Sequence, residues 1–123
     1  MNRRAIARLR RICLALPEAE ERETWGIATW RIRGRIFCMW STTDATEAAL
    51  WCKAPPGIQG MLVEAAPERF FIPPYVGHKG WIGVVLDASV DWDEVAALVR
   101  RSWRMTAPKR LAATLPQDDA GSA

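Results

Sequence analysis

Hydrophobic positions recur with helical spacing near the two ends of the chain and alternate with polar positions between them. The first apolar stripe has the 3.6-residue period of a helix and consists of Ile6, Leu9, Ile12, Cys13 and Leu16. It predicts a helix over residues 3–16, because Pro17 ends the pattern. The acidic run that follows, residues 17–23, is expected to form a turn.

Three strand-like segments follow the acidic run. The first two, 28–32 and 35–40, flank Arg33-Gly34, which is a tight hairpin signal. Trp30 and Ile32 alternate with Thr29 and Arg31, so one face of the sheet is predicted to be covered and the other to be partly wet. The third strand is predicted over residues 47–54.

The second half of the chain predicts further helices and strands. Asp91 can cap a long helix, and Glu94 completes the pattern of a capping box. Pro108 breaks or restarts that helix. The remaining segments are a helix over 58–65, a short strand over 69–72, a loop over 73–80 and a strong strand over 81–87.

The order of these elements predicts an α+β fold. Hairpins dominate and no regular βαβ alternation is present, so we expect an antiparallel sheet packed on one face by the N- and C-terminal helices. One domain over residues 1–113 is predicted, because 123 residues suit a single core. The polar segment 114–123 is predicted to be a disordered tail.

Composition narrows the class of protein. The three cysteines (13, 38 and 52) are odd in number and lack a CxxC pair, which argues against a disulfide framework and a zinc site. Free thiols favour a reducing cytoplasm. No apolar run approaches the roughly 20 residues of a membrane span. We therefore expect a cytoplasmic protein without a membrane partner, metal or cofactor.

Charge is distributed unevenly, although the net charge is only +3. Residues 1–16 carry five arginines and no acid, and residues 100–110 carry five more basic residues, again with no acid. Two basic ends suit a polyanionic partner. Solvated helix faces are the usual explanation of such charge runs, so the charge alone does not establish a polyanionic partner.

Longer stretches resemble a known family. The segment PPYVGHKGWIGVVLDASVDWDEVAALVRRSWRMTAPKRLAA, together with CLALPEAEERETWG (13–26) and RIFCMW (35–40), is similar to the MmcQ/YjbR family of small bacterial proteins. The marks are a helix ending in Leu-Pro-acid, a Gly-Lys/Arg-type hairpin, a Pro-Tyr loop leading to a Trp strand, and a final helix ending in APKRL. The resemblance implies a CyaY-like, double-wing architecture and a DNA-binding label, and it supplies no catalytic residue.

The frataxin/CyaY resemblance raises the question of iron. Frataxin-like proteins handle iron through an acidic ridge on the first helix and strand, because hard cations prefer carboxylate oxygens. Here the first helix carries Arg3, Arg4, Arg8, Arg10 and Arg11. That charge repels a cation, so the sequence argues against iron delivery.

DNA binding would use basic residues that can neutralise phosphates. Arg31, Arg33 and Arg35 surround the hairpin turn at Gly34 and make a basic wing plausible. The other candidates are Lys79 in the 73–80 loop and the C-terminal set Arg104, Lys109 and Arg110. Solubility and edge protection explain hairpin arginines as well.

The alternative is a non-catalytic module for a small anionic ligand or a protein partner. Its candidate residues are Tyr75, His78 and Trp81, which surround the loop GHKG. His78 is the sole histidine, so nucleophilic catalysis would require Cys38 or Cys52 beside it. The spacing requires no such contact, and no enzyme class is indicated.

Overall fold

A six-stranded antiparallel sheet forms the centre of the molecule. The computed structural model describes residues 3–43 and 47–115. The strands follow the order β1-β2-β3-β4-β6-β5, so neighbours in the chain pair as hairpins except at the β4–β6 crossover. Their bounds are β1 Ala19–Thr24, β2 Ile27–Ile32, β3 Arg35–Thr43, β4 Glu47–Cys52, β5 Phe70–Phe71 and β6 Ile82–Val85.

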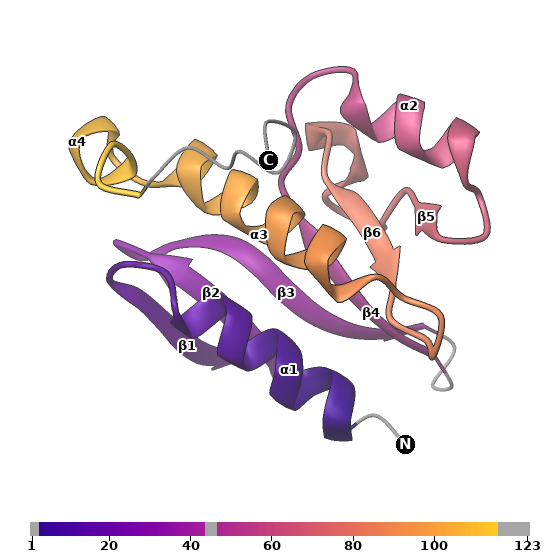
Figure 1. Ribbon diagram of the computed structural model, residues 1–123, viewed down its shortest axis with the longest axis horizontal. Helices are drawn as coiled ribbons and strands as arrows, with labels where there is room; N and C mark the ends of the chain where they lie inside the picture. Colours follow the sequence, from indigo (N-terminus) through magenta and orange to yellow (C-terminus); the bar gives the residue numbers. More distant parts are fainter. Residues whose placement is uncertain (1–2, 44–46, 116–123) are drawn as a thin grey trace.

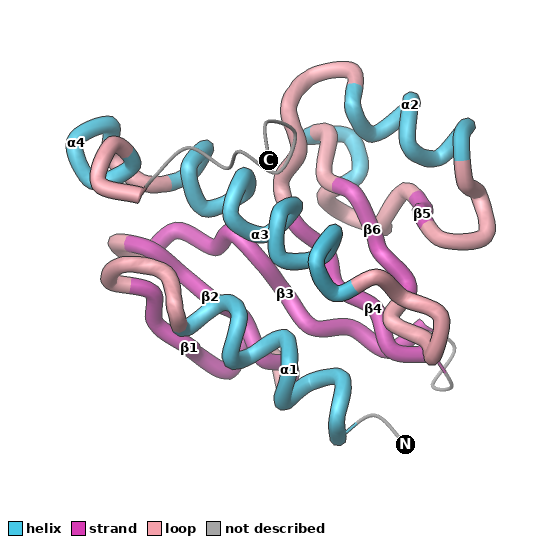
Figure 2. The backbone as a smooth tube through the Cα atoms, in the orientation of Figure 1, coloured by secondary structure: helices cyan, strands magenta, loops and turns pink. Residues whose placement is uncertain are grey.

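The long helices lie on one face of this sheet. Figure 1 shows α1 (Arg3–Leu14) and α3 (Trp92–Thr106) across the same side of the strands, while α2 (Ile58–Ala65) lies beside β5 and β6. In Figure 2 the same arrangement appears as cyan helices in front of magenta strands. Two short elements complete the fold: the 3₁₀ helix η1 (Gly77–Lys79) and α4 (Lys109–Ala112). The predicted α+β class with an antiparallel sheet is confirmed.

The core lies between the sheet and the two long helices. Leu9 of α1, Trp30 of β2 and Trp103 of α3 are fully buried there. The indole Nε1 of Trp103 donates to the carbonyl of Pro17 at 3.1 Å, which fastens α3 to the segment before β1. None of the helices in residues 3–43 and 47–115 is long and apolar enough to cross a membrane.

The structure confirms the hairpin turn, the helix cap and the helix restart that the sequence predicts. Arg33 and Gly34 both have positive φ, at 53° and 82°, as a tight hairpin turn requires. The Asp91 side chain caps α3 by accepting from the backbone N–H groups of Asp93 and Glu94. Pro108 precedes α4, so it restarts the helix. The chain turns after α4 through Thr114 and Leu115, and the rest of the predicted tail, 116–123, lies outside the described residues.

The acidic run is a strand, which corrects the predicted turn at 17–23. Its residues from Ala19 onward form β1, which pairs with β2 along its whole length. Glu21 faces the core side, where its carboxylate accepts from Arg10 at 2.7 and 2.9 Å and from the indole of Trp30 at 3.1 Å. An inward carboxylate is tolerated here because its charge is paired with Arg10 and both of its oxygens accept hydrogen bonds.

Glu21 makes stability dependent on pH. The Arg10 hydrogen bonds, assisted by Trp30, hold the pKa of Glu21 below its ordinary value of 4.5, against the opposing effect of burial. A carboxylate with a lowered folded-state pKa contributes stability above its ordinary pKa, and this contribution is lost as pH falls through the folded value.

We expect Glu21→Gln to lower the free energy of unfolding by about 1 kcal/mol at neutral pH, since Gln keeps an acceptor for Trp30 and loses the ion pair. Below the lowered folded-state pKa of Glu21, the variant and the wild type should be equally stable. Urea denaturation at both pH values measures this. Glu20→Gln is the matched control, because the carboxylate of Glu20 is exposed and lies 3.6 Å from Arg22. Equal losses at both pH values would show that the ion pair is not the cause.

Candidate anion-binding site

Three cationic side chains gather at one end of the sheet. Lys53 directly follows β4, Arg35 opens β3, and Lys79 ends η1 just before β6. The strand register brings them together, because Cys52, the last residue of β4, pairs with Cys38 of β3 on one side and Ile82 of β6 on the other. Arg35, Lys53 and Lys79 are called the basic cluster below.

Lys53 is the electrostatic centre of the basic cluster. Burial lowers the pKa of its ammonium group, and the positive charges of Arg35 and Lys79 lower it further. The side chain is half-buried, and its backbone N–H donates to the Ser102 hydroxyl of α3 at 2.8 Å. Lys53 is therefore a cation held in place beside two like charges.

No carboxylate compensates this charge within the part of the chain that the structure describes. The ion pairs found there are Arg10–Glu21, Arg22–Glu20, Arg33–Glu18 and Arg69–Glu94, and none includes a member of the basic cluster. Because a half-buried cation beside other cations is unfavourable, an anion placed here would relieve repulsion as well as gain attraction.

The loop before β6 holds Lys79 in position. Gly80 has a φ of +88°, and the Gln59 amide of α2 donates to the carbonyls of Gly77 and Trp81 at 2.8 and 2.7 Å. Gly77 is buried against Ile72, whose methyl group lies 2.5 Å from where a Cβ would stand. One glycine thus permits the turn and the other permits close packing.

The predicted ligand corner of Tyr75, His78 and Trp81 is not assembled. Trp81 is 6% exposed and packs in the interior, whereas Tyr75 is 86% exposed and His78 is also exposed. A ring that projects into solvent lines no enclosed pocket with a ring that is buried. Trp81 directly precedes β6 and is buried, as expected for the first residue of the apolar segment 81–87.

Two of the three predicted wing arginines have partners within the protein. Arg33 donates to both carboxylate oxygens of Glu18 at 2.7 and 3.2 Å. Arg31 donates to the hydroxyls of Thr24 and Thr29 at 2.7 and 3.4 Å. Only Arg35 of the hairpin joins the basic cluster, so the hairpin contributes one cation to the site rather than three.

The C-terminal candidates lie in a different place. Lys109 and Arg110 are exposed on α4, and Arg104 lies in the last turn of α3. Arg104 and Lys109 line a surface groove together with Met105 and Leu115. The structure brings Arg104 and Lys109 together at the end of α3 and the start of α4.

The three cysteines form a buried group. Cys38 pairs directly opposite Cys52 across β3 and β4, and Cys13 of α1 contacts Cys38. All three are fully buried, and burial raises the pKa of the Cys38 and Cys52 thiols. His78 is exposed, whereas these thiols are closed off from solvent. Among the described residues, no three His, Cys, Asp or Glu side chains are grouped so as to hold a metal ion.

Comparison with known proteins places the chain in a family. The YjbR family model matches residues 14–105, which include β1 through most of α3. The chain belongs to the YjbR family. A solved structure, Deinococcus radiodurans protein DR2400 with its DUF419 domain, is 21% identical with a TM-score of 0.75, over 96% of this chain and 94% of that chain. This similarity shows the shared fold. No curated protein matches the chain.

Sequence reasoning missed Lys53 in this YjbR-family protein. The signal present was a single lysine at the end of an apolar strand, directly before Ala54 and two prolines. A lysine at the end of a strand is ordinarily exposed to solvent. Only the register of β3, β4 and β6 brings Arg35 and Lys79 close to Lys53. Arg35 and Lys79 themselves were predicted as nucleic-acid-binding candidates, together with Arg31 and Arg33.

Proposed function

We propose that this YjbR-family protein binds the phosphate backbone of DNA through the basic cluster of Arg35, Lys53 and Lys79. The observation that carries the proposal is the place of Lys53, a half-buried cation that the strand register sets beside two others, with no ion pair to a carboxylate among the described residues. Phosphate groups carry the charge that such a cluster needs, and they occur along DNA at the spacing of a few ångströms.

The geometry favours backbone contact over base readout. Cations at a sheet end can follow successive phosphates, and phosphate contacts fix position without reading sequence. Tyr75 supports a secondary contact, since it lies in the same loop as Lys79 and its ring is 86% exposed. An exposed tyrosine can stack on an unpaired base, which is worth about 1–3 kcal/mol. We expect weak sequence preference and affinity that falls with salt.

Two broader features go with this proposal. A cytoplasmic site of action is supported by three buried free thiols, which persist in reducing compartments. A CyaY-like, double-wing architecture is supported by the antiparallel sheet with two long helices on one face, although Arg33 of the hairpin is occupied by Glu18.

Fluorescence anisotropy with a short labelled DNA duplex, across a salt series, tests the proposal. We expect micromolar affinity at low salt, and a log–log slope of about −2.7 for three neutralised phosphates at about 0.9 each. A single strand of equal length shows whether the contact of Tyr75 with unpaired bases adds affinity.

The matched comparison is between two hairpin arginines. Arg35→Gln should reduce the slope by about one phosphate, whereas Arg33→Gln should change it little because Glu18 already binds that guanidinium. Absence of binding at the lowest salt would refute DNA binding by this protein. Equal effects of the two substitutions would refute the assignment to the basic cluster.

A further inference from the structure

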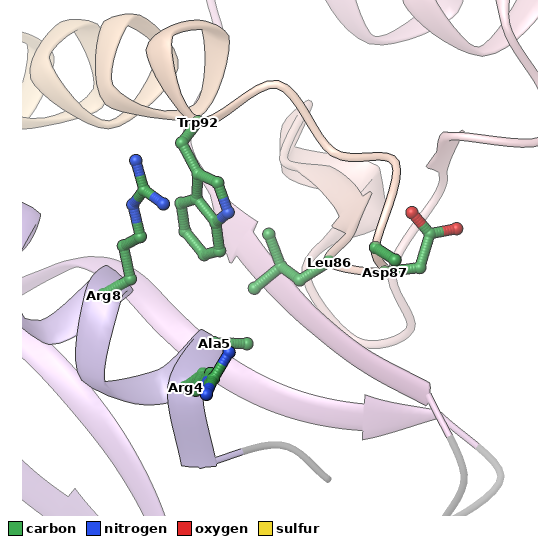
Figure 3. A pocket seen from close by; sticks show the side chains of 7 residues that line it. Arg4, Ala5, Arg8, Leu86, Asp87 and Trp92 are labelled. Carbon is green, nitrogen blue, oxygen red and sulfur yellow. The ribbon is translucent and has the colours of Figure 1, made fainter.

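A second cationic site lies at the opposite end of β6 from Lys79. A pocket of about 490 Å³ opens between the first turns of α1 and the connection from β6 to α3. Figure 3 shows this pocket from close by. It is lined by Arg4, Ala5, Arg8, Leu86, Asp87, Ala88 and Trp92. Arg4, Ala5 and Arg8 precede the residues that the family model matches.

The inner surface of the pocket is apolar. Leu86 is 5% exposed, and the Ala5 and Trp92 side chains are half-buried. In Figure 3 the Trp92 ring stands between Arg8 and Leu86, so an indole and an aliphatic side chain face the same space. Such a surface favours the hydrocarbon part of a ligand.

The rim of the pocket is cationic. Arg4 and Arg8 are one helical turn apart, so both project from the same side of α1. The Arg8 guanidinium stacks over the Trp92 ring, 5.2 Å from its centroid, which holds it at the pocket edge. No ion pair found among residues 3–43 and 47–115 includes Arg4 or Arg8.

The one acid in the lining does not neutralise these arginines. The Oδ1 atom of Asp87 accepts from the backbone N–H of Ser89 at 2.9 Å and from its hydroxyl at 2.7 Å. These bonds lower the pKa of Asp87. Figure 3 shows its carboxylate directed away from Arg4 and Arg8. The pocket therefore keeps an excess of positive charge at its rim.

We propose that this pocket binds a small amphiphilic organic acid, with its carboxylate or phosphate head between Arg4 and Arg8 and its apolar body against Leu86 and Trp92. A volume of about 490 Å³ lies within the range of sites for single small molecules. The apolar inner surface distinguishes it from a phosphodiester surface. The proposal is independent of DNA binding, because none of its residues belongs to the basic cluster.

The probe for this site is 8-anilinonaphthalene-1-sulfonate, a planar aromatic anion whose fluorescence rises in apolar surroundings. We expect saturable binding to the native protein, weakened about tenfold by Arg4→Gln and by Arg8→Gln, the effect of losing one charge-assisted hydrogen bond. The matched control is Arg3→Gln, which removes the same charge from an exposed residue outside the lining. Equal weakening by all three variants would overturn the proposal.

A second pair of variants changes volume without changing charge. Ala5→Leu places extra methyl groups in the pocket and should abolish probe binding with the melting temperature unchanged or raised. Ala7→Leu adds the same groups at an exposed position of α1 and should bind the probe normally. Unaltered binding to Ala5→Leu would show that the probe lies elsewhere.

Competition identifies the head group. Octanoate and octyl phosphate should each displace the probe, and the stronger of the two reports whether the native ligand is a carboxylic acid or a phosphate ester. Octanol carries the same chain without charge and should displace the probe at least about tenfold less well. Equal displacement by octanol would overturn the role of Arg4 and Arg8, whatever the outcome with DNA.

Discussion

Replacing the whole basic cluster, as Arg35→Gln, Lys53→Met and Lys79→Gln, is expected to weaken DNA binding at low salt about a hundredfold or more, since each lost charge-assisted contact is worth at least about 1 kcal/mol. The salt slope should approach zero with the cluster removed. Anisotropy with the short duplex measures both quantities.

The same variant should be at least as stable as the wild type. The pKa of Lys53 is lower in the folded protein than its ordinary value of 10.5, chiefly through burial. The protonated side chain therefore opposes folding at pH values below the folded pKa, and this opposition disappears as pH rises toward the ordinary value. Lys53→Met removes that charge, so the melting temperature at neutral pH should be unchanged or higher.

A control variant that loses the same number of positive charges distinguishes a specific site from the general electrostatic field of the protein. Arg3→Gln, Arg11→Gln and Arg22→Gln together also remove three positive charges, all from exposed positions outside the cluster. They should reduce affinity only modestly through the weaker long-range field. If both triple variants lose affinity equally, net charge alone explains the binding and the cluster is no site.

Ser102→Ala is expected to lower the free energy of unfolding by about 3 kcal/mol, because it leaves the Phe37 carbonyl and the Lys53 N–H without their shared partner. The fully buried hydroxyl of Ser102 donates to the carbonyl of Phe37 at 2.6 Å and accepts from the N–H of Lys53 at 2.8 Å. The hydroxyl thereby joins α3 both to β3 and to the residue that follows β4. The contact with β3 lies beside the point where the register between β2 and β3 shifts.

Urea denaturation measures this loss, which corresponds to a fall of roughly 10 °C in melting temperature for a domain of this size. Thr106→Ala is the matched control on the same helix, since that buried hydroxyl donates only to the Ser102 carbonyl at 2.8 Å. It should lower stability by less than about 1 kcal/mol. Equal losses would contradict the bridging role of Ser102.

Ser102 also connects stability to the site. Its hydroxyl holds the backbone of Lys53, so Ser102→Ala should weaken DNA binding at temperatures where the variant is still folded. A destabilised variant with unchanged affinity would show that the position of Lys53 does not depend on α3.

Signals that depend on neighbouring residues predicted the local structure well. The positive φ of Gly34, the Asp91 cap and the break at Pro108 follow from the conformational preferences of those residues. β1 was missed because AEERET carries no hydrophobic alternation, and its inward Glu21 is stabilised by Arg10 from another element.

The candidate site required information that the chain order does not carry. Arg35, Lys53 and Lys79 are far apart in sequence, and strand register alone brings them to one end of the sheet. The pairing of Arg33 with Glu18 likewise depends on tertiary structure. The sequence therefore indicated Arg35 and Lys79 as candidates, but it did not indicate that Lys53 lies beside them.

The most direct test of the central claim is the change in backbone amide NMR shifts of ¹⁵N-labelled protein as a short DNA duplex is added. We predict that the largest changes fall on residues 35–37, 53–54 and 77–80, around the basic cluster, and that they diminish with added salt. Changes absent from these residues, or concentrated on α1 and α4, would contradict the assignment of DNA binding to this end of the sheet.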